Sequence, residues 1–409
     1  MKTVLPYCKA FVLLIAAYFC FAVLSCMLPD KQIKSNIEKS APGLVSEGLY
    51  PKAVIRLKQC QMDNYTDALI MSQIYRINRK QPVRAAMKMV RADEIGHDWD
   101  QAGLLLRMTK GEDLEEATYA RYWHGNSFLF RPFFLLMDFT LLRWWLFAIS
   151  TLLMVALLCM FYREAGLLKT LALASGFVAT CGFVTQFSMQ FFPILALTVI
   201  TCMLVIKRGE SKRSGLLFFV VGSMACYFDL LTTPLLTLGM PLAVMLALKR
   251  NEDFRLKDNL LEILRLSVLW GVGFALTFVS KWALATLILG HNVFAEAFNV
   301  GLYRLGVDDF TRWDAVGKNF KMLVLPMIVI PALLLIVINV VRRKKFNVKK
   351  ALLFLLVGLM PYLWFLVLSN HSYLHWWFVY RLQAISVVCL FFMLTDMESR
   401  KQDSRDFLT

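Results

Sequence analysis

Long apolar stretches separated by short basic turns constrain this 409-residue chain more than any other feature of its sequence. A helix needs about 20 predominantly apolar residues to cross a bilayer core about 30 Å thick. With 58% hydrophobic residues, including 32 Phe, the chain is too apolar for a soluble protein of this length. We therefore expect an all-α, polytopic integral membrane protein with about ten transmembrane helices. The predicted spans lie near residues 11–28, 141–161, 167–185, 189–206, 215–230, 233–248, 264–289, 321–341, 351–369 and 381–396.

The cations of the short turns predict the orientation, because cytoplasmic loops carry an excess of Lys and Arg. Basic clusters occupy the turns at 207–213, 249–257 and 342–350, whereas the turns at 185–190 and 228–233 contain no Lys or Arg. This alternation fits ten spans in a plasma membrane, with both termini cytoplasmic. The net charge of +16 then reflects topology and attraction to anionic lipid headgroups, so no nucleic-acid partner is needed.

The spans divide the chain into four parts. Residues 1–28 form the cytoplasmic N-terminus and first transmembrane helix, 29–140 an outer segment, 141–396 the transmembrane bundle and 397–409 a cytoplasmic tail. The outer segment is too long for a turn, and its amphipathic stretches at 65–77 and 112–123 predict a helical cap. Two further outer loops are expected at 290–320 and 370–381. The first apolar stretch could also be a signal peptide ending near Cys26, but an uncleaved helix fits its length better.

All the histidines fall on the predicted outer side. If the protein has an active face, this asymmetry places that face outside the cell. The five residues are His97, His124, His291, His371 and His375.

The first candidate chemistry is a pair of acids in the outer segment. Asp63 and Asp67 stand four residues apart and would share one face of a helix, where they could hold a divalent cation or where one could act as a base. The alternative is structural: Asp63 or Thr66 caps the helix, and its dipole favours the acids.

An aromatic cluster precedes the second span. Arg121, Tyr122, Trp123 and His124 suit a site that stacks on a sugar ring and orients a phosphate. Tyr and Trp also gather at any bilayer interface, which would explain the aromatics but not His124.

Three charged residues lie inside or at the outer edge of predicted spans. They are Lys281, Asp229 and Arg381. A charge near a helix centre costs about 2.5 to 3.5 kcal/mol on insertion scales, so such residues usually face a cavity or a partner. Lys281 and Arg381 could neutralise a lipid phosphate, and Asp229 could pair with Lys281 or bind a metal. Arg381 could instead reach the headgroups by snorkelling.

The loop at 370–381 is rich in polar aromatics. His371 and His375 stand at i and i+4, and Tyr380 adjoins Arg381. Hydrogen bonding to a phosphate or sugar suits this pair better than metal binding, because no third ligand is visible nearby; ordinary interfacial histidines are the alternative.

Taken together, these features resemble the GT-C superfamily of membrane glycosyltransferases, which take a sugar from a polyprenyl-phosphate carrier. The likeness covers the whole chain as an architecture and rests on short motifs. It implies that Asp63 or Asp67 is the catalytic acid, although Asp63 lies farther beyond the first helix than the acid of that superfamily commonly does. By the same likeness, Lys281, His371, His375, Tyr380 and Arg381 hold the donor phosphate, while Arg121, Tyr122, Trp123, His124 and Asp229 line the acceptor side.

The expected function is therefore transfer of a sugar from a polyprenyl-phosphate donor to an envelope glycan, lipid or protein, in a chain whose short loops look bacterial. No cofactor is implied with certainty, and a divalent cation, Mg or Mn, could take part. Two alternatives stay open. A lipid-linked saccharide flippase would need charges along a two-sided path, and an outer-leaflet polymerase or ligase would share the Arg and His chemistry.

Overall fold

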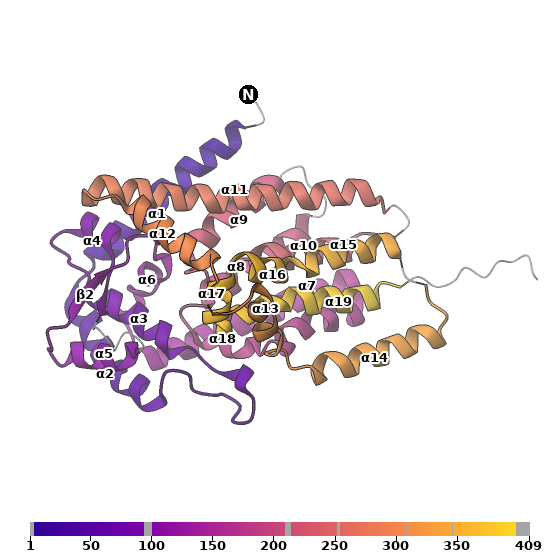
Figure 1. The fold of residues 1–409 in the computed structure, drawn as a ribbon, viewed down its shortest axis with the longest axis horizontal. Helices are drawn as coiled ribbons and strands as arrows, with labels where there is room; N and C mark the ends of the chain where they lie inside the picture. Colours follow the sequence, from indigo (N-terminus) through magenta and orange to yellow (C-terminus); the bar gives the residue numbers. More distant parts are fainter. Residues whose placement is uncertain are drawn as a thin grey trace, which may run out of the picture.

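The computed structural model describes residues 4–93, 100–208, 214–251, 254–307, 309–345 and 347–397. His97 lies outside these residues. The described chain is nearly all helical, as the hydrophobic pattern predicts, and its one sheet has two strands. Figure 1 shows a bundle of helices along the long axis, with the segment between the first and seventh helices gathered at one end.

Five helical stretches are long and apolar enough to cross a membrane. They are Leu5–Met27, Phe139–Ala179, Leu256–Leu289, Val348–Val367 and Trp376–Thr395. Three shorter apolar helices accompany them, at Ser214–Phe228, Leu236–Leu248 and Pro326–Val341. By length and composition, these helices fit a polytopic helical membrane protein.

The bundle is built from the chain after residue 138. Its main helices are α7 (Phe139–Ala179), α8 (Phe192–Arg208), α9 (Ser214–Phe228), α10 (Leu236–Leu248), α11 (Leu256–Leu289), α14 (Pro326–Val341), α15 (Val348–Gly358), α16 (Met360–Val367) and α19 (Ala384–Thr395). Gly166 interrupts α7 with φ +78°, a left-handed conformation that suits glycine. This break falls between the second and third predicted spans.

Two stretches of short helices connect bundle helices. The first holds α12 (Val293–Leu305) and α13 (Arg312–Phe320), and the second holds α17 (Ser369–Leu374), α18 (Trp376–Val379) and the 3-10 turn η4 (Tyr380–Gln383). A further 3-10 turn, η3 (Gly182–Phe187), joins α7 to α8.

The amino-terminal segment, which we define as the residues between α1 (Leu5–Met27) and α7, contains short helices and a hairpin-like sheet. Its helices are α2 (Asp30–Glu47), α3 (Asn64–Tyr75), α4 (Pro82–Lys88), α5 (Gln101–Thr109) and α6 (Gly125–Phe130), with the turns η1 (Lys58–Cys60) and η2 (Phe133–Leu135). Helix α3 confirms the helix predicted at 65–77.

The helix predicted at 112–123 is wrong. Glu115–Thr118 is strand β2, which pairs antiparallel with β1 (Val90–Asp93). The pairing continues past the strand, because Tyr119 N–H donates to the Met89 carbonyl at 2.7 Å. Satisfying these backbone groups across the sheet outweighs the weak helical periodicity of this short stretch.

Buried Arg131 ties the amino-terminal segment to the first helix. Its guanidinium donates to the carbonyls of Ser25 at 2.9 Å and Ile74 at 2.7 Å, and it forms an ion pair with Asp30. One side chain thereby satisfies carbonyls near the ends of both α1 and α3.

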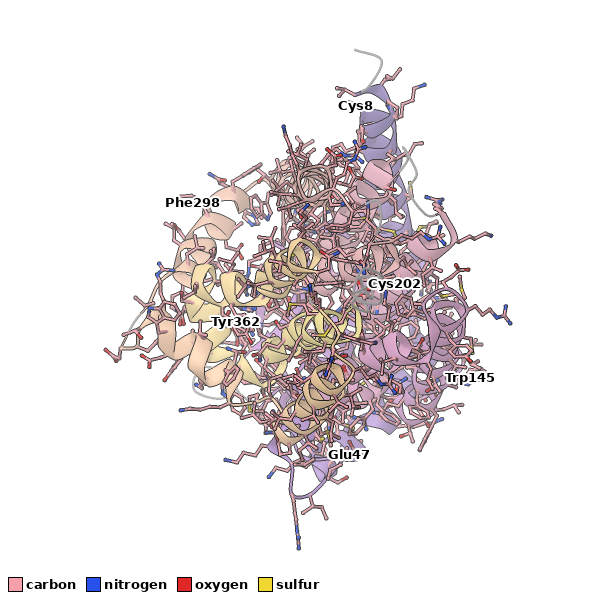
Figure 2. The ribbon with its side chains drawn as sticks, turned by 90° about the vertical axis from the view of Figure 1, so that its right-hand side faces the viewer. Cys8, Glu47, Trp145, Cys202, Phe298 and Tyr362 are labelled. Atoms are coloured by element: carbon pink, nitrogen blue, oxygen red, sulfur yellow. The ribbon has the colours of Figure 1, made fainter. Side chains whose placement is uncertain are left out.

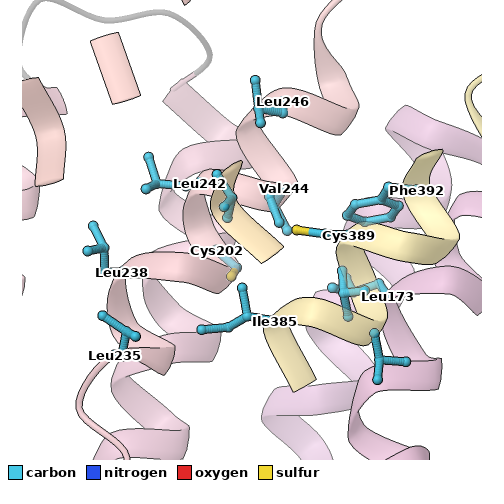
Figure 3. Packing of buried hydrophobic residues seen from close by; sticks show 14 of the residues in the cluster. Leu173, Cys202, Leu235, Leu238, Leu242, Val244, Leu246, Ile385, Cys389 and Phe392 are labelled. Carbon is cyan, nitrogen blue, oxygen red and sulfur yellow. The ribbon is translucent and has the colours of Figure 1, made fainter. Parts of the chain in front are cut away.

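The bundle core is a continuous apolar layer. Figure 3 shows Leu173 of α7, Cys202 of α8, Leu242 of α10 and Ile385 of α19 facing this layer. Viewed from the bundle end, Cys202 lies in the interior and Trp145 and Phe298 lie at the periphery (Figure 2). Exposed apolar side chains of this kind suit contact with lipid.

Candidate functional site

A polar cavity of about 240 Å³ opens where the amino-terminal segment meets the two connecting stretches of short helices. The residues that line it come from α3, β1, the segment after β2, the turns before α8 and after α9, α12, and the stretch from α17 to α18. They are Tyr65, Thr66, Leu69, Arg91, Tyr119, Arg121, Gln190, Leu230, Arg304, His371, His375, Trp377 and Phe378. Three arginines, two histidines and several aromatic rings thus face one space.

A separate apolar space, which we call the groove, lies among the bundle helices. Its wall is formed by α7, η3, α8, α10 and the start of α19, and it encloses about 70 Å³. The lining residues are Met154, Leu157, Leu173, Phe177, Thr180, Gly182, Thr185, Phe191, Leu195, Thr198, Val199, Cys202, Thr233, Leu236, Met240, Arg381 and Ala384. The hydroxyls of Thr180, Thr185 and Thr198 donate to carbonyls of their own turns, so Arg381 is the charged residue in a mainly apolar wall.

The two spaces share their structural supports. Gln190 lines the cavity and the next residue, Phe191, lines the groove; likewise Leu230 lines the cavity and Thr233 the groove. Trp377 of the cavity and Arg381 of the groove stand one turn apart, and an Arg381 N–H donates to the Trp377 carbonyl at 3.0 Å. Neighbouring residues of three chain segments thus line the groove and the cavity, and we call the region of these residues around Arg381 the junction.

Arg381 is buried at this junction. The Nη2 of Arg381 donates to the Gln61 carbonyl at 3.0 Å. The guanidinium lies 5.0 Å from the centre of the Phe191 ring. Its Nε–H has no hydrogen-bond partner among the described residues. These contacts hold the guanidinium inside the protein, unlike a snorkelling arginine.

Asp63 caps α3 and faces the same junction. Its carboxylate accepts the Thr66 N–H at 3.0 Å and the Thr66 hydroxyl at 2.9 Å. Burial raises the pKa of Asp63, and the Thr66 hydrogen bonds and the Arg381 charge oppose that rise. The Trp377 side chain also lies beside it. Asp63 itself lines neither space, but Thr66, its partner, lines the polar cavity.

Asp67 fastens α3 to the turn before α8. It accepts the Ser188 hydroxyl and the Met189 N–H, both at 3.0 Å. Burial raises its pKa to about 7, although the positive charge of Arg143 favours the ionised form. The two acids expected to share a face are both buried, but they point at different partners.

The polar cavity carries two cations that the sequence reading did not single out. Arg304 of α12 lies 5.5 Å from the centre of the Tyr122 ring, and Arg91 of β1 lies 5.8 Å from that of Tyr119. Arg121, which was predicted, contacts the Tyr119 ring at 4.3 Å and pairs with Glu296 at 3.0 Å. Cations spaced along the chain give no periodic signal, so only the folded structure shows that Arg91 and Arg304 line one cavity.

His371 of α17 and His375, which follows this helix, both line the cavity. His371 Nε2 lies 2.7 Å from the Leu231 carbonyl, and the rings of His371 and His375 are 4.8 Å apart. Burial lowers the pKa of His371 well below its usual value and that of His375 to about 4. Neutral imidazoles therefore face the cavity at pH 7.

Besides Asp63 and Asp67, six predicted site residues line neither space. Lys281 donates to the Ala86 and Met87 carbonyls at the end of α4, at 3.3 and 3.0 Å, and pairs with no acid there. Trp123 is fully buried and donates to the Thr277 carbonyl at 2.7 Å. Tyr380 donates to the Gln59 and Thr180 carbonyls at 2.7 and 2.8 Å.

Two more of these residues, Tyr122 and His124, form a buried pair beside the cavity residues Tyr119 and Arg121. Their rings are 6.0 Å apart, and His124 Nε2 lies 2.7 Å from the Tyr119 carbonyl. Burial lowers the pKa of His124 to about 3. Asp229 is buried at the end of α9, beside Thr232 and next to the cavity residue Leu230.

The donor set does not fit a metal held by the protein. Within the described part of the chain, no three His, Cys, Asp or Glu side chains gather in a way that could hold an ion. Comparisons of the chain with protein-family models, with curated proteins and with solved structures found no match. Fold and site together define a polytopic helical membrane protein with a polar cavity at one end of its bundle.

Proposed function

We propose that this protein is a membrane glycosyltransferase that moves a sugar from a polyprenyl-phosphate donor to an extracytoplasmic hydroxyl. The observation that carries the proposal is the junction at Arg381, where neighbouring residues of the same chain segments line an apolar groove and a polar cavity. A lipid-linked sugar is divided in a matching way: its apolar chain suits the groove, its phosphate suits Arg381 and its polar sugar ring suits the cavity.

The proposed topology has about ten spans, both termini in the cytoplasm and the amino-terminal segment as an outer cap. The polar cavity lies on the side of that segment. At the opposite end of the bundle, Lys350 donates to the Lys249 carbonyl and pairs with Asp396, which also pairs with Lys169 at 2.9 Å. Cations gathered at that end agree with a cytoplasmic face.

The groove is the proposed binding site for the part of the isoprenoid chain that lies nearest the phosphate. Met154 and Met240 stand in its wall, and methionine side chains repack readily, so a chain can widen the groove on entry. The Arg381 guanidinium would then meet the phosphate, whose charge and geometry suit a planar fork of N–H donors.

The polar cavity is the proposed seat of the sugar and the acceptor. Tyr65, Trp377 and Phe378 offer faces on which a sugar ring can stack, and Arg121 and Arg304 offer donors to its oxygens. The neutral His371 and His375 can each donate or accept a hydrogen bond with a hydroxyl.

The proposed reaction is a displacement at the anomeric carbon. The acceptor oxygen forms a bond to this carbon, the bond from carbon to phosphate oxygen breaks, and the phosphate leaves with the electron pair on its lipid. The hydroxyl proton passes to Thr66 Oγ1 while the Thr66 proton passes to Asp63, because Thr66 lines the cavity and already donates to Asp63. Arg381 stabilises the charge that grows on the leaving phosphate.

Asp67 has a positioning role in this proposal. Its hydrogen bonds to Ser188 and Met189 hold the turn that carries Gln190 into the cavity wall. No step is assigned to Mg or Mn, because the acids near the junction have separate protein partners.

The test is transfer by the full chain reconstituted with radiolabelled polyprenyl-phosphate sugars and a panel of envelope acceptors. Asp63→Asn keeps an N-cap acceptor for Thr66 but cannot take a proton, so we expect turnover to fall at least 100-fold. Thr66→Val should lose turnover similarly, whereas Thr66→Ser, which keeps the hydroxyl, should retain most of it.

Wild-type turnover in both Asp63→Asn and Thr66→Val would remove the assigned proton path. Absence of transfer from every lipid-linked sugar, in a preparation that binds polyprenyl phosphate, would remove the glycosyltransferase proposal itself.

A further inference from the structure

A second cavity, of about 180 Å³, lies in the amino-terminal segment between α3, α4 and the β1–β2 sheet. Its lining is mainly polar and basic. The residues are Gln73, Arg76, Ile77, Asn78, Gln81, Arg84, Ala85, Lys88, Met89, Val90 and Glu116. The mechanism proposed above uses none of them.

Gln73 gives this second cavity an unused hydrogen-bond donor. Its side chain is only 1% exposed, and its Oε1 accepts the Ser127 hydroxyl at 2.7 Å. Its Nε2 has no hydrogen-bond partner among the described residues. A buried amide N–H without a partner is destabilising, so a ligand oxygen that accepts from it would remove this penalty.

The charges of the second cavity favour an anion. Glu116 pairs with Arg76 at 2.9 Å and with Lys88 at 3.7 Å, which leaves an excess of positive charge. Arg84 adds an exposed guanidinium at the rim. The amides of Asn78 and Gln81 suit hydroxyl groups, which both accept and donate.

The second cavity and the polar cavity are built on the same elements. Thr66, Leu69 and Gln73 stand at i, i+3 and i+7 on one face of α3. Thr66 and Leu69 line the polar cavity, and Gln73 lines the second cavity. At a rise of 1.5 Å per residue, Thr66 and Gln73 are about 10 Å apart along the helix. In β1, Val90 and Arg91 divide between the two cavities in the same way.

We propose that the second cavity binds an anionic segment of a saccharide acceptor whose reacting hydroxyl lies in the polar cavity. This inference rests on the proposed function, because it assigns the class of acceptor. The anionic group is a carboxylate or a phosphate borne by a sugar, and both present the oxygens that Gln73, Arg84 and Lys88 can bind.

The test measures binding to the full chain in nanodiscs by isothermal titration calorimetry, with glucuronate, glucose 6-phosphate and glucose as probes. We expect at least one of the two anionic sugars to bind and glucose to bind at least tenfold more weakly. Which of the two binds more tightly separates the carboxylate from the phosphate. Arg84→Ala should weaken anion binding at least fivefold, whereas Lys80→Ala removes the same charge from an exposed neighbour outside the lining and should not.

Equal loss of binding in Arg84→Ala and Lys80→Ala would overturn the proposal, as would equal binding of glucose and both anions. Neither result bears on the transfer reaction, which the Asp63→Asn variant tests. The two proposals can therefore be refuted independently.

A different observation concerns the thiols of Cys60 and Cys181. Both are buried in one small apolar cluster with Val184 and Val324, and their side chains are in contact. The Tyr380 hydroxyl bridges the carbonyls of the two preceding residues, Gln59 and Thr180, which holds the two chain segments together. The spacing of 121 positions hides this pair in the sequence.

We propose that Cys60 and Cys181 form a disulfide on the outer face, where the surroundings are oxidising. The two thiols lose two protons and two electrons to a disulfide-bearing oxidant, which is reduced to two thiols as the new S–S bond forms. The bond would fasten η1 to the end of α7 beside Arg381.

The test blocks free thiols in denatured whole cells with an alkylating agent and then maps peptides of the full chain by mass spectrometry. We expect a Cys60 to Cys181 cross-linked peptide that disappears on reduction, and Cys226 alkylated in the same sample as the free-thiol control. Full alkylation of Cys60 and Cys181 without reduction would overturn the disulfide proposal. That result would not bear on the transfer reaction, which the Asp63 and Thr66 variants test.

Discussion

At the scale of single residues, the buried acids make stability depend on pH. The folded-state pKa of Asp67 is raised from 3.8 to about 7, so the folded protein holds a proton that the unfolded chain releases. Between about pH 4 and pH 7 the unfolded state therefore binds fewer protons, and stability falls as pH rises.

Asp67→Asn removes this dependence while keeping an acceptor for the Met189 N–H. We expect the difference in melting temperature, variant minus wild type, to increase between about pH 4 and pH 7. Above about pH 7 this difference should stay constant. Thermal unfolding of the detergent-solubilised chain at a series of pH values measures it. The matched control is Asp100→Asn, at an exposed N-cap whose side chain accepts the Gly103 N–H. A variant of Asp67 with the wild-type pH profile would contradict the account.

Sequence reasoning located several site residues but not their partners. The spacing of His371 and His375 placed both on one wall, and Arg121 was found because it lies among aromatics. Lys281 was correctly taken as a buried charge, but its partners are carbonyls at the end of α4, a short helix that gives little periodic signal. Arg304 and Arg91 were missed because nothing in their neighbourhoods distinguishes them before the chain is packed.

At the scale of elements, glycines set the distance between α9 and α11. A Cβ added to Gly273 would lie 2.1 Å from the Phe219 carbonyl oxygen, and one added to Gly222 would lie 2.0 Å from that of Trp270. Helix backbones in contact of this kind tolerate only the smallest side chains.

Gly273→Val should therefore push the two helices apart and cost about 1 to 3 kcal/mol, the usual penalty for overpacking. Gly271→Val is the matched control, because its added Cβ meets no atom within 4 Å. Thermal unfolding in the same detergent compares the two. Equal melting temperatures would show that α9 and α11 do not depend on this contact.

The elements also show where hydrophobic pattern succeeds and fails. Apolar runs predicted α1, α9, α10, α11 and α14 because burial in lipid leaves a long, simple signal. The β1–β2 pair was missed because four-residue strands depend on a partner distant in sequence, and the sheet has no apolar alternation of its own.

At the scale of the whole molecule, the two ends of the bundle should face different compartments. A membrane-impermeant maleimide applied to intact cells should label Lys80→Cys, in the amino-terminal segment, and should not label Lys257→Cys, beside the start of α11. Both positions are exposed in the structure, so access alone does not separate them. Labelling of both, or of Lys257→Cys only, would contradict the proposed orientation.

In the proposed mechanism, one lipid-linked donor occupies the groove and the polar cavity together. The most direct measurement is a cryo-electron microscopy structure of the full chain in nanodiscs with polyprenyl monophosphate. We predict the isoprenoid chain between α7, α8, α10 and α19 with its phosphate against Arg381, and loss of that density in Arg381→Gln. Lipid bound elsewhere, or a groove that stays empty at saturating lipid, would contradict the account.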